Sequence, residues 1–188
     1  MASRFTKDYF DGYKFIEVPK KNGKGTRRVM EYIGEWYGIK CSSKEHKRFK
    51  IWAACLSVVA LTVYLLCVLS RASVNMHQYA ALPAALILLP MLFLFMGVVS
   101  FLIAKEKWER RVYHSGYRRM YRGAIGNTAL FGLSFIVGAV YTIISDSPAE
   151  LIDYGYLAGM LIGTACSAAL LAMIRAKPAK VVQAGTKE

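Results

Sequence analysis

The sequence predicts an all-α integral membrane protein: a four-transmembrane-helix bundle with both termini cytoplasmic, a small N-terminal cytoplasmic β-hairpin, and an amphipathic basic helix between spans 2 and 3. Four long apolar runs divide the 188 residues, none of them contains a charged residue or a histidine, and 24 of the 25 lysines and arginines lie in segments on one side of them. Core helices of soluble proteins seldom run this long without a charge. The chain therefore divides into a cytoplasmic segment (1–50), a transmembrane domain (51–175) and a cytoplasmic tail (176–188).

Each apolar run approaches or exceeds the length needed to cross a bilayer. A transmembrane helix needs about 20 apolar residues, because at about 1.5 Å per residue it crosses about 30 Å of hydrocarbon. The first run begins only at Ile51, whereas a cleaved signal peptide lies within about the first 30 residues, so we expect an uncleaved first helix. The predicted spans cover residues 51–69, 79–104, 124–144 and 154–174.

The distribution of cations predicts the orientation of these spans. Thirteen lysines and arginines lie in residues 1–50, seven in 105–123 and four from Arg175 onward, whereas the loop 70–78 has one and the loop 145–153 has none. Basic residues favour the cytoplasmic side of short loops. Both termini are therefore expected in the cytoplasm. A bacterial inner membrane is the expected location, because the chain is short and carries no targeting sequence.

The formal net charge of +13 is concentrated on the predicted inner face. Such a face is suited to anionic lipid headgroups. Residues 1–50 carry no recognised nucleic-acid-binding motif, so nucleic acid is not an expected partner.

Residues 1–50 predict a β-hairpin. Residues 13–18 and 28–33 roughly alternate polar and apolar side chains, and the turn-rich segment between them contains Asn22-Gly23. An isolated two-stranded hairpin is marginal in water, so it has to pack on something. Two interpretations follow: a cap that lies on its own bundle, or a docking module for a partner chain. Ser43 is the predicted N-cap of a helix that runs on into the first span.

The segment 105–122 predicts an amphipathic helix with an aromatic face and a basic face. Tyr113, Tyr117 and Tyr121 recur at helical spacing, and Gly116 is expected to interrupt the helix before the third span. The sharper hypothesis is a site for a phosphorylated lipid or an acidic protein segment; the alternative is that the cations only obey the positive-inside rule. The residues of the predicted site are Arg111, Arg118, Arg119 and Arg122.

The fourth span carries small residues at every fourth position, a pattern that lets helix backbones approach closely in lipid. The third span offers a matching ridge. Packing between these two spans is one interpretation, and a homo-oligomer interface is the other. The predicted packing residues are Gly155, Gly159, Gly163 and Ser167 on the fourth span and Ser134 and Gly138 on the third.

In the second span, Pro90 removes a backbone hydrogen bond and predicts a kink near residues 86–90. The spans contain no ionisable acid or base, which argues against a self-contained ion-coupled transporter. The four cysteines form no CxxC pair, and the three histidines lie in different segments. We therefore expect no metal, no cofactor and no catalytic site.

Three functions remain. The leading one is a non-enzymatic accessory or scaffold subunit that works by association, through a basic cytoplasmic face that contacts anionic lipid, a protein partner or both. The second is a small oligomeric transporter or channel for an uncharged or anionic solute. The third is a membrane enzyme that acts on lipids, for which the sequence offers no nucleophile–base pair.

Overall fold

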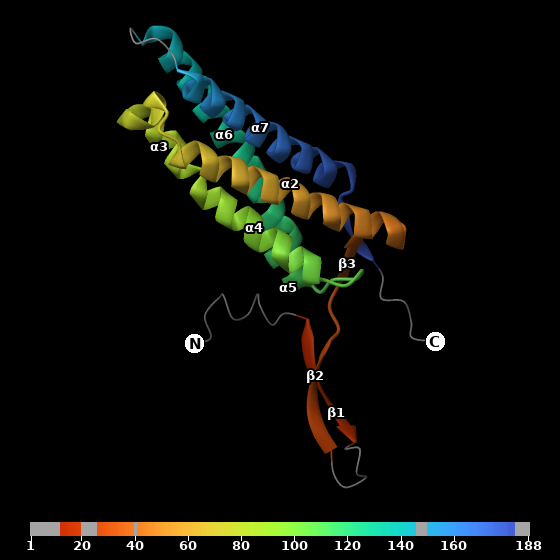
Figure 1. Cartoon of the computed structure of the whole chain (residues 1–188). Coiled ribbons are helices and arrows are strands. Elements are labelled where there is room, and N and C mark those ends of the chain that lie inside the picture. Colours follow the sequence, from red (N-terminus) through yellow and green to blue (C-terminus); the bar gives the residue numbers. More distant parts are fainter. Residues whose placement is uncertain (1–11, 20–25, 40, 146–149, 183–188) are drawn as a thin grey trace, which may run out of the picture.

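The computed structural model describes residues 12–19, 26–39, 41–145 and 150–182. Four long helices pack side by side as a bundle, and two small two-stranded sheets lie at one end of it (Figure 1). We call this the basic end; it also holds the start of α2 (Ser43–Leu69) and the end of α7 (Leu151–Ala176). The opposite, far end holds the 3-10 helix η1 (Ser73–Met76) and the start of α7.

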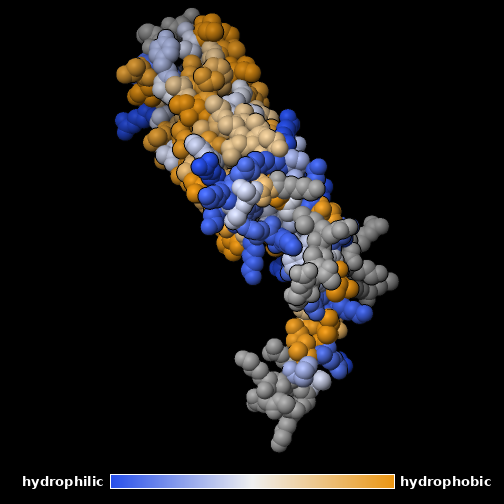
Figure 2. All heavy atoms as spheres, turned by 90° about the vertical axis from the view of Figure 1, so that its right-hand side faces the viewer, coloured by the Kyte–Doolittle hydropathy of each residue, from blue (hydrophilic) through white to orange (hydrophobic). Residues whose placement is uncertain are grey.

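Four helical segments are long and apolar enough to cross a membrane, as the sequence predicts: Ser43–Leu69, Ala81–Ile103, Arg110–Ile144 and Leu151–Ala176. They identify a multi-pass membrane protein. Figure 2 shows apolar side chains over most of the bundle surface, with hydrophilic side chains gathered toward the end that carries the sheets.

The first helix begins one residue earlier than predicted. Ser42, not Ser43, is the N-cap: its backbone is extended (φ −66°, ψ 156°), and its Oγ accepts a hydrogen bond from the backbone N–H of Glu45 at 3.3 Å. Ser43 is the first residue of the helix itself. From that position its side chain cannot accept from the free N–H groups of the first turn as the side chain of Ser42 does.

The second span is interrupted at Ile87, which separates α3 (Gln78–Leu86) from α4 (Leu88–Ile103). The break lies within the stretch in which a kink is predicted. Pro90 has no N–H to donate to the carbonyl of Leu86, so the regular helical ladder is incomplete at this point. Ile87 itself keeps a helical backbone (φ −57°, ψ −30°), and its N–H donates to the carbonyl of Ala84 at 3.2 Å.

The third span starts earlier than predicted, and Gly116 does not end a helix. The chain turns back at residues 104–109 and is helical from Arg110 onward, through α5 (Arg110–Val112), the π-helix η2 (Tyr113–Arg118) and α6 (Arg119–Ile144). An added Cβ on Gly116 would lie 3.4 Å from the backbone nitrogen of Phe101. This is an ordinary van der Waals distance, so Gly116 is a buried residue packed on α4 and not the site of a turn.

The predicted N-terminal hairpin is confirmed. Strand β1 (Tyr13–Pro19) pairs antiparallel with β2 (Thr26–Tyr32), with Tyr13 opposite Tyr32 and Pro19 opposite Thr26. The Asn-Gly pair of the predicted turn lies outside the described residues. A second sheet was not predicted: β3 (Trp36–Ile39) pairs antiparallel with β4 (Ala179–Val182), which belongs to the C-terminal tail.

The helices α4 and α6 approach closely enough for their backbones to touch. An added Cβ on Gly97 would lie 2.5 Å from the backbone nitrogen of Met120, and one on Gly123 would lie 2.6 Å from that of Leu94. Real Cβ atoms do not approach so closely, so only glycine fits at these two positions without a shift of the helices. Between membrane helices, such proximity increases dispersion and weak Cα–H contacts.

Candidate interaction surfaces at the two ends of the bundle

An aromatic cluster attaches strand β3 to the basic end. The backbones of Trp108 and Tyr37 exchange two hydrogen bonds, at 2.7 and 2.8 Å. The Trp108 side chain is buried and packs edge-on against Phe101 of α4, with ring centroids 5.3 Å apart. Tyr37 stacks on Tyr113 of η2 at 4.5 Å. The bundle therefore fixes the position of the segment that joins the hairpin to α2.

The C-terminal tail is attached to the same end. The hydroxyl of Tyr117 lies 2.9 Å from the carbonyl oxygens of both Ile174 and Lys177, so it can donate to the free carbonyls at the end of α7. The Nζ of Lys177 lies 3.0 Å from the carboxylate of Glu45 in α2. This pair is partly exposed and contributes little stability by itself. The tail then enters β4, where it completes the sheet begun by β3.

The hairpin is held at its base by two tyrosines. The hydroxyl of Tyr13 donates to the carboxylate of Glu109 in the 104–109 turn. The backbone N–H of Arg110 donates to the hydroxyl of Tyr32 at 3.1 Å. Burial, followed by the hydrogen bond to Glu109, raises the pKa of Tyr13 to about 12. The rings of Tyr13 and Tyr32 also pack edge-to-face, with centroids 5.0 Å apart.

Beyond this base the hairpin stands away from the bundle (Figure 1). It does not lie over the helix ends as a cap, because the described attachments involve only its base. Phe15 and Met30 face each other across the strands, and 66% and 43% of their surfaces are exposed. The next rung of the same face is the exposed ion pair between Glu17 and Arg28, at 3.2 Å. The hairpin thus presents an apolar rung beside a charged one.

The four arginines of the predicted site are spread over α5, η2 and α6. Arg111 is exposed and lies close enough to Tyr13 for its charge to act against the rise of that tyrosine's pKa. It belongs with the base of the hairpin. Arg118 is the last residue of the π-helix η2, and Arg119 and Arg122 follow it in α6. A π turn contains more residues than an α turn, so the positions before η2 are rotated relative to α6.

The remaining arginines surround the start of α6. The guanidinium of Arg118 lies 3.2 Å from Nδ1 of His114, and that of Arg119 lies over the ring of Phe93 in α4, with 5.9 Å between guanidinium carbon and ring centre. Arg118 and Arg122 are exposed, whereas Arg119 is half-buried. The predicted aromatic face of this segment points inward: Tyr117 and Met120 are buried.

The glycines of α7 face different neighbours. An added Cβ on Gly159 would lie 2.3 Å from Sγ of Cys67 in α2, and one on Gly163 would lie 2.4 Å from the ring of Phe131 in α6. Gly155 differs, because an added Cβ there would meet nothing within 4 Å. The row of small residues thus approaches two helices within the chain, and its first member approaches neither.

The partner positions on α6 lie inside the same bundle. Gly138 packs on α7, since an added Cβ would lie 3.0 Å from Leu157. Ser134 and Ser167 are buried, and their hydroxyl oxygens have no hydrogen-bond partner among the described residues.

At the far end, Asp153 joins η1 to α7. One carboxylate oxygen accepts hydrogen bonds from the backbone N–H and the hydroxyl of Ser73, at 2.8 and 2.7 Å; the other accepts one from the N–H of Glu150 at 3.1 Å. Asp153 is buried, so these bonds satisfy a carboxylate that water does not reach. Its role is structural: it holds the two far-end connections together.

In the part of the chain that the structure describes, no group of three or more histidine, cysteine, aspartate or glutamate side chains is placed to hold a metal ion. No protein-family model, curated protein or solved structure matches the chain.

Proposed function

We propose that this multi-pass membrane protein acts by association, as an accessory or scaffold subunit of a bacterial inner membrane with both termini in the cytoplasm. In this proposal the basic end contacts anionic lipid headgroups and the hairpin contacts a protein partner. The observation that supports it most directly is the hairpin, which stands away from the bundle with Phe15 and Met30 exposed.

The exposed rung favours a protein partner over a purely structural role. A two-stranded hairpin is marginal in water, and exposed apolar side chains on it gain stability when another surface covers them. Both strands are edges, whose free N–H and C=O groups can pair with an added strand. The attachment at Tyr13 and Tyr32 orients the hairpin without covering this face.

Purification from native membranes tests the partner. A stoichiometric partner protein is expected to accompany the wild type and to be lost with the Phe15→Ser/Met30→Ser double variant. The matched control is Glu17→Ser/Arg28→Ser, which alters the next rung of the same face and removes an exposed ion pair worth little. If the wild type is recovered alone, or if both double variants lose the partner equally, association through the apolar rung is excluded.

The lipid contact has its own test. Arg111, Arg118, Arg119 and Arg122 are changed together to Gln, and anionic lipid retained by the protein from mixed phosphatidylglycerol–phosphatidylcholine vesicles is measured by native mass spectrometry. We expect a clear loss of anionic lipid, since a cation near an anionic surface contributes about 1 kcal/mol. The control changes four other exposed cations to Gln: Lys44, Lys47, Arg48 and Lys180. An equal loss in both variants would mean that total charge, rather than these arginines, determines the preference.

A second candidate is a small oligomeric transporter or channel for an uncharged or anionic solute. It is favoured by a cavity of about 370 Å³ between α2 and α7, beside the unfilled space at Gly155. A small residue beside an open groove can admit a helix of a second copy. Native mass in lipid nanodiscs separates the candidates: a homo-oligomer without another protein favours the transporter.

A further inference from the structure

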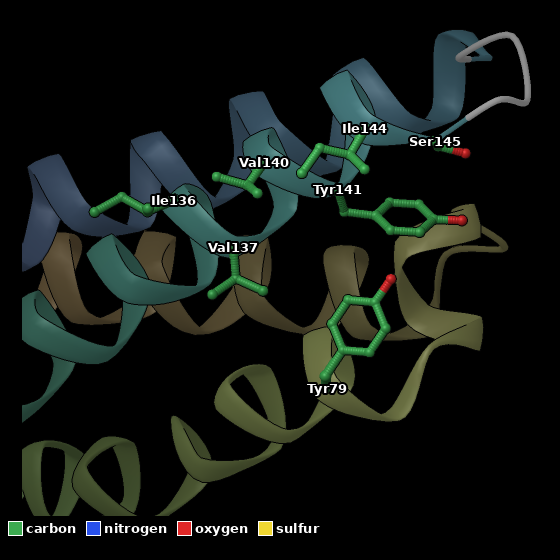
Figure 3. Close-up of a pocket in the computed structure, with 7 residues that line it drawn as sticks. All are labelled: Tyr79, Ile136, Val137, Val140, Tyr141, Ile144 and Ser145. Atoms are coloured by element: carbon green, nitrogen blue, oxygen red, sulfur yellow. The ribbon is translucent and has the colours of Figure 1, made fainter.

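A pocket of about 400 Å³ lies at the far end between α3 and α6, remote from the basic end (Figure 3). Ile136, Val137, Val140 and Ile144 of α6 form its apolar walls. Tyr79 of α3 and Tyr141 of α6 stand at its polar end. Ile136 and Ile144 are 58% and 73% exposed, so in a bilayer the pocket opens sideways to lipid.

The dimensions of the pocket suit one alkyl chain. Its aliphatic residues extend over two turns of α6, from Ile136 to Ile144, which is about 12 Å at 1.5 Å per residue. One leaflet of the hydrocarbon core is about 15 Å thick. A chain lying along α6 would therefore have its polar head beside the tyrosines, near the membrane surface at the far end.

Tyr79 and Tyr141, which line that polar end, pack with a third ring, that of His77. We call them the aromatic box: His77, Tyr79 and Tyr141. The ring centroids of His77 and Tyr141 are 4.7 Å apart, those of His77 and Tyr79 5.6 Å, and those of Tyr79 and Tyr141 6.2 Å. Rings at these separations can lie within about 6 Å of a single cation, the distance at which the negative face of an aromatic ring attracts a positive charge.

The charge of the far end also favours a cation. The connections there carry one cation, Arg71, against three carboxylates in the sequence, at Asp146, Glu150 and Asp153. This is the reverse of the basic end. A net negative charge raises the local concentration of cations and disfavours anionic headgroups.

We propose that the pocket binds an amphiphile with a quaternary ammonium head: its alkyl chain lies along α6 and its ammonium contacts the aromatic box. Cation–π recognition of quaternary ammonium groups by clustered rings is a common solution, because such cations cannot donate hydrogen bonds and gain from soft, electron-rich surfaces. The amphiphile is either a choline phospholipid of the bilayer or a soluble lipophilic cation; both have the same head chemistry.

Equilibrium dialysis of radiolabelled decyltrimethylammonium against the protein in phosphatidylethanolamine–phosphatidylglycerol nanodiscs tests the proposal, with empty nanodiscs subtracted. Saturable binding is expected, and an equal concentration of decyl sulfate should not displace the probe. Tyr79→Leu and Tyr141→Leu should each weaken binding about two- to fivefold, the effect of one exposed cation–π contact. Val140→Phe, which fills the pocket and leaves every ring in place, should abolish it.

The control is Tyr154→Leu, an exposed far-end tyrosine outside the pocket, which should bind like the wild type. Absence of saturable binding, displacement by decyl sulfate, or equal weakening by Tyr154→Leu would overturn the proposal. Nanodiscs that contain phosphatidylcholine distinguish the sources: loss of probe binding identifies the bilayer lipid as the occupant, and unchanged binding identifies a soluble cation. None of these results depends on a protein partner at the hairpin.

Discussion

The glycines of the bundle differ in what surrounds their missing Cβ. At Gly97 and Gly123 the neighbour is backbone, which cannot rotate away. At Gly159 and Gly163 the neighbour is a side chain, the thiol of Cys67 or the ring of Phe131. A glycine in a helix costs about 1 kcal/mol relative to alanine, so each of these four positions retains glycine against helix propensity because a neighbour occupies the space.

We predict a graded series of alanine substitutions. Gly97→Ala should destabilise the bundle most, because α4 and α6 have to separate; Gly159→Ala and Gly163→Ala should each cost about 1–3 kcal/mol, the usual range for overpacking. Gly155→Ala is the matched control in the same helix, since an added methyl meets open space and should be neutral or stabilising. Equilibrium unfolding in detergent measures the series. Equal effects at Gly155 and Gly159 would contradict the assigned contacts.

We predict that Tyr13 titrates far above an ordinary tyrosine. Its pKa is raised to about 12, chiefly by burial and then by Glu109, so the neutral hydroxyl is favoured when the hairpin is attached. The attachment is therefore fully present below about pH 10, the usual tyrosine value, and is lost as the pH rises through about 12. The near-ultraviolet absorbance of the wild type minus that of Tyr13→Phe isolates this one group. A midpoint near pH 10 would show that the contact does not form.

At the scale of elements, the second sheet is what completes the basic end. Strand β3 has β4 on one edge and the isolated bridge from Tyr37 to Trp108 on its other side. It therefore connects the N-terminal segment, the 104–109 turn and the C-terminal tail in one structure. Gly38, opposite Lys180, is buried within this contact.

We predict that a chain ending at Lys177 loses the order of β3 while the helices remain intact. Without β4, the backbone of β3 loses its ladder, and hydrogen exchange at residues 36–39 should accelerate by at least tenfold. A chain ending at Val182 is the control, because it retains the whole strand. Exchange within α2 and α7 should be the same in both. Unchanged protection of residues 36–39 in the shorter chain would mean that Trp108 alone orders β3.

The elements that could be predicted from the sequence are those set by local patterns. Long uncharged runs specify the four spans, and two alternating segments around a turn specify the hairpin. The pairing of β3 with β4 could not be predicted, because its partners are at least 140 residues apart and each strand has only four residues. The predicted interruption at Gly116 was wrong for a related reason: the glycine packs against the backbone of Phe101, which belongs to another helix.

The candidate sites were less predictable than the fold. Helical spacing places Arg111 on one stripe with Arg118 and Arg122, but residues 113–118 form a π-helix, which periodicity at 3.6 residues does not register. The far-end pocket joins Tyr79 with Tyr141 across two helices. The inward turn of the aromatic face around Tyr117 depends on the ring of Trp108 and on the carbonyls of Ile174 and Lys177, which local periodicity does not show.

At the scale of the whole molecule, the two ends have opposite chemistry. The basic end combines cations, buried aromatic rings and an exposed hairpin, whereas the far end is small, net acidic and holds the aromatic box. The bundle between them is apolar, and its close contacts are made by glycines. Polar recognition is therefore expected at the ends, and the far-end pocket extends from there along α6.

We predict that Lys187 and the hairpin lie on the same, cytoplasmic side of the membrane, because basic residues in short loops favour that side. Reporter fusions that are active only in the cytoplasm or only outside it, placed after Lys187 and within the loop 70–78, provide the measurement. The loop is expected outside. A reporter that places Lys187 outside would reverse the orientation of both ends and remove the basis for a cytoplasmic partner.

The strand that completes the basic end has a consequence for biosynthesis. Because β4 follows α7 in the chain, the ribosome makes it only after all four candidate spans have been translated. Until then β3 lacks its partner strand, although the hairpin and Trp108 already exist. Any protein that requires the finished sheet would bind fully inserted chains and ignore nascent ones. The sheet at the basic end is therefore complete only in a chain translated through β4.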